Sequence, residues 1–315
     1  MLVAVVAVTG CTADSGVDSV DARPSATSTP RSADETPDDL EATDGDAGAD
    51  TAVPVDEILA ELEANGFCDP TDVESTGDIG TTTAMQFVVA AVPAPPCYGE
   101  PDDRLDEAWA ELETIAPTEF LDDIGVLAGY EACEGCDTLA FVTPLDEAGS
   151  FFLMAIDVTA AQDDPDELSL TLLHELSHVF TQDPSGQVDV DVSADVCDTY
   201  HNGNGCVTES SYLWEWMTRF WPADVLAAFV DGEADEQAGE QRCELGGRFT
   251  GSYGASSPEE DFAEVFAAYV FDVDFDGELA EKLAFFDDYD EFREIRSRAA
   301  DVGRAGLPNT FERCG

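Results

Sequence analysis

Residues 171–180 read Thr171-Leu172-Leu173-His174-Glu175-Leu176-Ser177-His178-Val179-Phe180. Apolar residues surround the polar ones at helical spacing, so we expect this segment to be a largely buried helix. His174 and His178 are four residues apart, which places both imidazoles on one face of a helix, about one turn apart. Two ring nitrogens in that arrangement can bind a single Zn²⁺.

The competing interpretation is a buried helix whose two histidines are only hydrogen-bonded. The scarcity of histidines favours a metal site. The chain has three histidines, and two of them, His174 and His178, form this pair. Glu175 occupies the position from which a carboxylate can take a proton from water beside the metal. We therefore predict one zinc ion per chain, with Glu175 as general base.

A zinc ion in a hydrolytic site needs a third protein ligand and a position open to water. His201 is the remaining histidine, but it lies in a polar loop rich in Asn and Gly. A carboxylate on a second helix is the other option. We expect such a helix at 258–271, because Ser257 is a good N-cap and Pro258 fits the first helical position.

The first turn of this second helix is acidic, with Glu259, Glu260 and Asp261. Acids at a helix N-terminus complement the helix dipole, which is a sufficient explanation for Glu259 and Asp261. Glu264 follows one turn later among apolar residues, and an acid at the edge of an apolar face needs a partner. The third ligand stays open among Glu259, Glu260 and Glu264.

Further motifs accompany the histidine pair. They are Ser211-Tyr212-Leu213, Phe220-Trp221, Tyr253-Gly254 and Ser257-Pro258-Glu259-Glu260-Asp261-Phe262-Ala263-Glu264-Val265-Phe266. With these motifs, residues 168–286 resemble the gluzincin zinc metallopeptidases. They resemble most closely a group of uncharacterised bacterial zinc-binding metallopeptidase lipoproteins, and more distantly the anthrax lethal factor catalytic domain. The histidine motif does not continue with the Gly and third His of metzincins.

The resemblance implies a zincin-like peptidase whose zinc ligands are His174, His178 and Glu260. It implies that Glu175 is the general base and that Glu264 orients a ligand imidazole from outside the coordination sphere. It also implies that Tyr253 stands over the metal and hydrogen-bonds the oxyanion of the tetrahedral intermediate. The competing interpretation of Tyr253 is an aromatic residue in a glycine-rich loop.

The charge balance is extreme, with 70 Asp and Glu against 12 Lys and Arg and a formal net charge of −58. Lys282 is the only lysine. Such a surface repels the phosphates of nucleic acids and anionic lipid headgroups, so we expect no nucleic-acid partner. We interpret it as a solubility device suited to a salty medium, in which repulsion between carboxylates is screened.

The N-terminal residues predict export. Residues 1–10 are an apolar run ending in Val8-Thr9-Gly10-Cys11, too short to span a bilayer. A small residue before Cys11 fits signal cleavage followed by acylation; the alternative is a truncated signal peptide with an ordinary Cys. Residues 12–52 are acidic and nearly free of large apolar residues, so we predict a disordered tether. The folded domain is expected at 53–315, either held at the outer face of the cell membrane by the lipid alone or secreted.

Eight further cysteines form an even set, which favours disulfides in an exported chain. They are Cys68, Cys97, Cys133, Cys136, Cys197, Cys206, Cys243 and Cys314. Cys133 and Cys136 could also be half of a zinc knuckle or a redox pair, but no second such pair exists in the sequence. The local pairings expected for the others are Cys68 with Cys97, Cys197 with Cys206, and Cys243 with Cys314.

Hydrophobic periodicity predicts strands first and helices afterwards, hence an α+β fold: a small N-terminal mixed sheet with helices, then a mostly helical C-terminal part. The expected strands are 85–92, 138–142 and 151–158. The expected helices begin with one from near Val53 that stops at Gly66, and continue at 102–115, 119–128, 167–180, 209–220, 223–230, 258–271 and two between 278 and 300.

These observations favour a zinc-dependent peptidase that acts on peptide or protein substrates at the cell surface. Two alternatives remain. One is a lipid-anchored binding or scaffold protein with a structural or inactive zinc site. The other is a factor that processes one partner or itself and has no general proteolytic activity.

Overall fold

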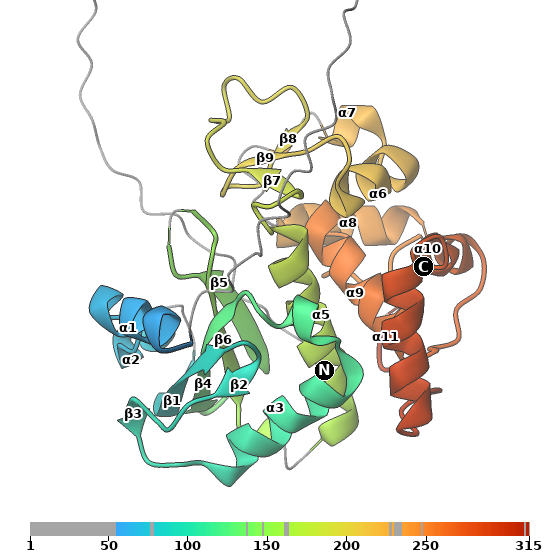
Figure 1. Cartoon of the computed structure of the whole chain (residues 1–315). Coiled ribbons are helices and arrows are strands. Elements are labelled where there is room, and N and C mark those ends of the chain that lie inside the picture. Colours follow the sequence, from blue (N-terminus) through green and yellow to red (C-terminus); the bar gives the residue numbers. More distant parts are fainter. Residues whose placement is uncertain are drawn as a thin grey trace, which may run out of the picture.

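A mixed β-sheet with helices on both faces forms the N-terminal part of the protein, and a mostly helical part follows (Figure 1). The computed structural model describes residues 55–314 apart from 76–78, 137, 147, 161–163, 227–228, 230–234, 247 and 312. The predicted signal segment with Cys11 and the predicted tether at 12–52 lie outside the described residues. The α+β fold class expected from the sequence is confirmed.

The large sheet has the strand order β2-β1-β4-β6-β5, and β3 also pairs with β1. Its strands are β1 (Thr81–Val89), β2 (Val92–Pro93), β3 (Tyr98–Gly99), β4 (Ile124–Glu131), β5 (Ala140–Pro144) and β6 (Phe152–Asp157). β4 and β6 are parallel, whereas the other neighbouring strands are antiparallel. β5 stands at the end of this order, and the helix that carries the histidines packs beside it.

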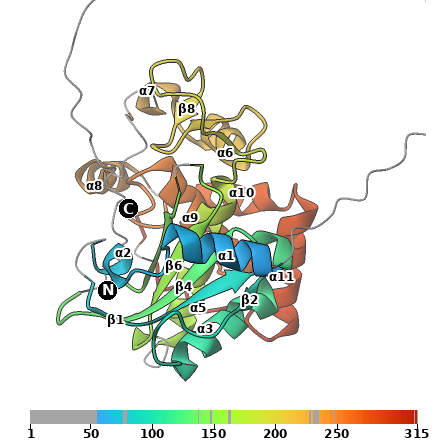
Figure 2. The same cartoon turned by 60° about the vertical axis from the view of Figure 1, so that its left-hand side comes forward.

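Successive side chains of a strand point to opposite faces of the sheet, and each face has its own apolar core. The helices that cover the sheet are α1 (Val55–Asn65), α2 (Pro70–Glu74), α3 (Asp103–Ile115) and α5 (Pro165–Thr181). Met85 and Phe87 of β1 pack in the cluster that includes Leu62 of α1, whereas Val88 packs in the cluster that includes Trp109 of α3. Figures 1 and 2 show α1 on one face of the sheet and α3 and α5 on the other.

The second part is built around α9, a helix that packs against α5 on its far side from the sheet (Figure 1). The helices of this part are α6 (Tyr212–Phe220), α7 (Ala223–Leu226), α8 (Glu236–Leu245), α9 (Pro258–Val270), α10 (Glu278–Phe286) and α11 (Asp290–Asp301). Every residue of α9 except Glu259 is buried. Because α6, α10 and α11 also pack on it, α9 is the central element of the helical part.

The predicted helix at 119–128 is wrong. A short 3₁₀ helix, η1 (Thr118–Phe120), is followed there by β4, which has a strand on each side and is buried over all residues but its last. A strand buried on both faces has a continuous apolar run, and periodicity cannot distinguish such a run from a buried helix.

The predicted strand at 85–92 crosses a hairpin turn. β1 ends at Val89, and Ala90 and Ala91 have φ values of 51° and 58°, so β2 returns antiparallel to β1. Two successive residues with positive φ are typical of tight hairpin turns, and Gly or Asn usually occupies these positions. Here both residues are alanine, so the sequence gives no sign of the turn. The other predicted strands and helices correspond to elements of the structure with shifted ends.

A small sheet and α8 were not predicted. The small sheet has the order β7-β9-β8, formed by β7 (Val188–Asp189), β8 (Tyr200–His201) and β9 (Cys206–Val207). Strands of two residues are too short to show alternation in the sequence. Polar residues dominate α8, so its apolar periodicity is weak.

The eight cysteines pair as the sequence analysis expects. The disulfides are Cys68–Cys97, Cys133–Cys136, Cys197–Cys206 and Cys243–Cys314. The third closes the hairpin of β8 and β9, and the fourth attaches α8 to the C-terminal segment. Among the described helices, none has both the length and the apolar composition that a bilayer span requires.

A buried ion pair joins α9 to α10. Asp261 and Lys282 are almost completely buried, and the Lys282 ammonium donates to Asp261 Oδ1. The indole N–H groups of Trp216 and Trp221 donate to Asp261 Oδ2 at 3.0 and 2.9 Å. The carboxylate is therefore matched by one cation and two further donors, which is the condition for keeping a charge in a core.

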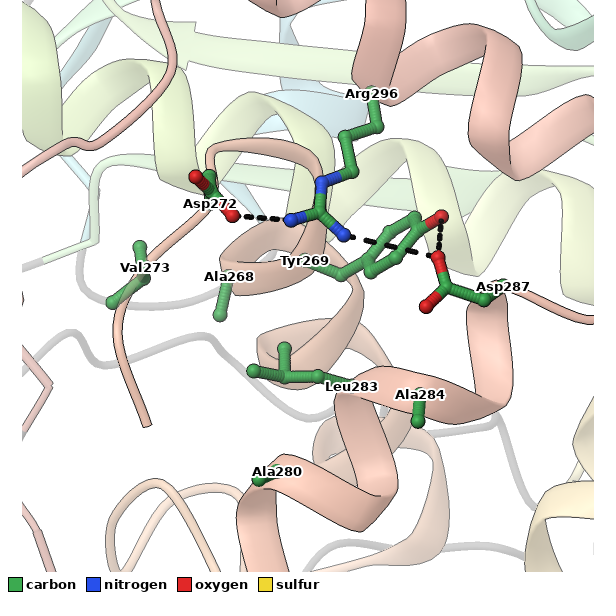
Figure 3. Close-up of a pocket in the computed structure, with 9 residues that line it drawn as sticks. All are labelled: Ala268, Tyr269, Asp272, Val273, Ala280, Leu283, Ala284, Asp287 and Arg296. Carbon is green, nitrogen blue, oxygen red and sulfur yellow. Dashed lines mark hydrogen bonds and ion pairs between the residues drawn. The ribbon is translucent and has the colours of Figure 1, made fainter. Parts of the chain in front are cut away.

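The C-terminal end of α9 is held by a second, more exposed network (Figure 3). The Arg296 guanidinium stacks 4.7 Å from the ring centre of Tyr269 and bonds Asp272. Tyr269 donates to Asp287 Oδ1 at 2.9 Å. These side chains line a pocket of about 150 Å³ over α9, α10 and α11, and none of His174, His178 and Glu260 lies in its wall.

The buried pair predicts a strong stability effect. Asp261→Asn leaves the Lys282 ammonium buried without its counter-ion, so we expect a loss of about 3–5 kcal/mol in the free energy of unfolding. Urea denaturation measures it. The double variant Asp261→Asn with Lys282→Met should be more stable than Asp261→Asn alone; equal stabilities would contradict the role assigned to the pair.

Candidate metal centre

Helix α5 places both histidines on its face toward α9. The helix begins after Asp164, whose carboxylate accepts from the Glu167 amide at 3.1 Å, with Pro165 at the first position. The expected i, i+4 geometry is present: the His174 and His178 ring centres are 4.9 Å apart and their Nε2 atoms 3.2 Å apart. Both imidazoles are buried.

Helix α9 supplies the third group. It begins after Ser257, whose hydroxyl accepts from the Glu260 amide at 3.2 Å, and this cap fixes Glu260 in the first turn. Glu260 Oε2 lies 3.0 Å from His174 Nε2 and 3.4 Å from His178 Nε2. In sequence, Glu260 follows His174 by 86 residues and His178 by 82 residues. The packing of α9 on α5 brings its carboxylate to the two imidazoles.

These three groups are compatible with one small cation. Glu260 Oε2 is buried and accepts no hydrogen bond of good geometry, although both imidazoles are within ion-pair distance. Two imidazole nitrogens and one carboxylate oxygen are the protein ligands of many catalytic zinc sites. Tetrahedral ligands at about 2.0–2.1 Å from zinc lie roughly 3.3 Å apart, close to the three separations observed here.

The protonation of the cluster is governed by burial and mutual charge. Burial lowers the pKa of His174. For His178 the carboxylate of Glu260 outweighs burial and raises the pKa to about 9. Burial alone would raise the pKa of Glu260, but the two imidazoles hold it well below its usual range. The carboxylate therefore requires positive charge beside it, which a bound cation would also supply.

Glu175 lies next to the ligand pair on α5 and is 1% exposed. Neither of its carboxylate oxygens has a hydrogen-bond partner of good geometry among the described residues. Burial raises its pKa to about 8, and the charge on Glu260 adds to the rise. A buried carboxyl beside the two imidazoles is available for proton transfer.

Tyr253 lies in the loop between α8 and α9 and faces the cluster. Its ring centre is 5.9 Å from that of His174. Burial raises the pKa of Tyr253 well above its ordinary value, and the neighbouring carboxylate of Glu260 adds to the rise. The phenol therefore stays protonated, and its hydroxyl can donate a hydrogen bond to a negative charge that develops nearby.

The other two candidate acids have different partners. Glu259 Oε2 accepts from the Tyr200 hydroxyl at 3.1 Å, which connects α9 to the hairpin closed by Cys197–Cys206. Glu264 Oε2 accepts from the Thr250 hydroxyl. Burial raises the pKa of Glu259 to about 7 and that of Glu264 to about 8. Of the three acids left open by the sequence, Glu260 is the one that reaches both imidazoles.

His201 is outside the cluster. It belongs to β8, and its Nδ1 accepts from the amide of Gly203 at 3.2 Å. Tyr200 and Thr250, which donate to Glu259 and Glu264, were not predicted from the sequence. No local motif marks either residue, because each contact joins a helix to a separate loop.

Comparisons with known proteins add little. No protein-family model matches the chain, and no curated protein matches it. A solved structure that matches is a "putative zinc-binding metallo-peptidase" from Bacteroides caccae, with 15% sequence identity over 66% of this chain and 70% of that chain. Its TM-score is 0.27, and at that value the likeness carries no argument about this chain.

The geometry predicts which acid binds the metal. Glu260→Gln should weaken zinc binding by more than the roughly 10–100-fold that groups outside the coordination sphere contribute. Glu259→Gln is the matched control on the neighbouring residue and should change affinity less than about threefold. Competition with a chromophoric chelator measures both dissociation constants. A larger loss for Glu259→Gln would make Glu259 the third ligand.

Proposed function

We propose that this protein is a zinc-dependent peptidase of the gluzincin type, with His174, His178 and Glu260 as metal ligands. The observation that carries the proposal is the convergence of these three groups from α5 and α9, with the buried carboxyl of Glu175 beside them. Among the described residues the cluster contains three ligand side chains, which is the number that catalytic zinc sites use.

When bound, zinc would act as a Lewis acid toward water and the peptide carbonyl. Glu175 takes the proton of the attacking water, since its buried carboxyl lies beside the two histidines on α5. It then passes that proton to the nitrogen of the departing amine. The Tyr253 hydroxyl donates to the carbonyl oxygen as negative charge develops there.

We infer that the peptidase domain spans 53–315 and acts outside the cytoplasm. Four disulfides support an oxidising compartment. In this proposal Cys11 carries the lipid and residues 12–52 hold the domain away from the outer face of the membrane, where its substrates are peptides or proteins. A site closed by a fourth protein ligand would instead favour a binding or scaffold protein.

The proposal is tested by removing the base. Glu175→Gln keeps the shape of the side chain but cannot accept a proton, so peptide hydrolysis should fall by at least about 100-fold. Zinc content measured on the same preparation should stay at one ion per chain. The matched control is Glu107→Gln, an exposed acid on α3, which should leave the rate unchanged.

Hydrolysis is followed with a fluorescence-quenched peptide library. Treatment with a chelator should abolish the activity of the parent protein, and added zinc should restore it. A parent protein that holds zinc and cleaves nothing in the library, or a Glu175→Gln variant with full activity, would overturn the assignment.

A further inference from the structure

Glu264 faces a loop rather than an imidazole. Its carboxylate accepts from the Thr250 hydroxyl and from the amide of Gly254. Neither His174 nor His178 is among the hydrogen-bond partners that the described structure gives it. Thr250 and Gly254 flank Tyr253, the residue that stands against the ring of His174. The contact therefore fixes the loop that carries the tyrosine.

Gly254 packs so closely on this carboxylate that no side chain fits. A Cβ atom at Gly254 would lie 2.4 Å from Glu264 Oε2 and 2.6 Å from Thr250 Oγ1. Thr250 is fully buried, and Glu264 is 9% exposed. Because the backbone and both side chains are in contact, the position of the loop at Tyr253 is set by Glu264 of α9.

The other side of the loop packs on α8. The Arg242 guanidinium donates to the carbonyl oxygens of Ala255 and Ser256. A Cβ atom at Gly239 would lie 2.4 Å from the carbonyl oxygen of Ser252, so helix and loop are in direct contact there too. The loop is held between two helices, and Glu264 supplies the contact on the side of the metal centre.

We propose that Glu264, with Thr250 and Gly254, is a positioning residue for Tyr253. The inference rests on the proposed function and departs from the role that the gluzincin resemblance implies, in which this acid orients a ligand imidazole. Glu264 lies one helical turn after Glu260. In this proposal, α9 therefore supplies a metal ligand and also determines the position of the tyrosine that faces the metal.

The two roles predict different losses. A group that orients a ligand imidazole contributes roughly 10–100-fold to metal affinity. A group that positions an oxyanion donor affects the rate instead, because the tyrosine acts in the transition state. The variants are Thr250→Val, which removes the hydroxyl, and Glu264→Gln. Thr250→Ser retains the hydroxyl and should restore parental behaviour, and Thr218→Val is the matched control at an exposed site.

The first measurement needs no activity. Hydrogen exchange on the metal-free protein should become faster in peptides covering 250–256, where the Ser256 amide bonds the Tyr253 carbonyl at 2.8 Å. Exchange in α5 should not change. Zinc dissociation constants should stay within about threefold of the parent in both variants. If Thr250→Val fails to fold, Thr250→Ala removes the same hydroxyl without adding volume to the contact.

The second measurement is kinetic. Thr250→Val should lower kcat about 10-fold or more with KM nearly unchanged, and it should have no further effect in a Tyr253→Phe background. A 10–100-fold loss of zinc affinity with unchanged loop exchange would assign Glu264 to an imidazole and overturn the proposal. If the parent binds zinc but is inactive, the proposed function fails, whereas exchange and affinity still decide the role of Glu264.

Discussion

The packing of α9 across α5 is the constraint on which the candidate centre depends. It buries the Glu260 carboxylate against two imidazoles, with Oε2 within 3.0 and 3.4 Å of their Nε2 atoms. Removing a carboxylate from water is costly unless charge and directed donors compensate for the lost hydration. Here the charge is near, but among the described residues Glu260 Oε2 has no hydrogen-bond partner of good geometry. A cation that binds all three groups at once would satisfy the carboxylate and relieve the contact between the two ring nitrogens.

Three of the four acids on α9 illustrate how side chains of one helix contact different elements. Glu260 meets α5, Asp261 meets Lys282 of α10, and Glu264 meets the loop at Thr250. Glu260 and Glu264 are one turn apart and lie toward the metal centre, whereas Asp261 is rotated about 100° into the helical core. The buried ion pair thereby fixes the rotation of the helix about its axis. A rotated α9 would withdraw both the ligand and the loop anchor together.

The features of the fold and of the site that were predictable are those encoded within one helix. The spacing of His174 and His178, the capping by Ser257 and the stop at Gly66 are local, so sequence periodicity is sufficient to find them. Choosing Glu260 over its neighbours required a resemblance, because which face of α9 meets α5 depends on tertiary packing. The partner of Glu264 lies in a glycine-containing loop 14 residues earlier, and nothing in the sequence marks it.

The helix predicted at 119–128, where β4 lies, was wrong for a related reason. Its apolar run is continuous because both faces of the strand are buried, and the information that it pairs with β1 and β6 is not local. The disulfide pairings could be predicted because the cysteines of three of the four pairs are close in sequence. Lys282 was recognised as the only lysine, but its partner was hidden in a helix 21 residues away.

The acidity of the site and that of the surface have different consequences. On the surface, carboxylates are hydrated and screened by salt, so the large negative charge costs little. In the centre, burial raises the pKa of Glu175 to about 8, and the charge of Glu260 contributes to the rise. A divalent cation bound by Glu260 cancels that charge and stabilises the ionised form of a carboxyl beside it. In the proposed mechanism, a zinc ion would add to the positive charge of His178 beside Glu175 and favour the ionised carboxylate that a general base requires.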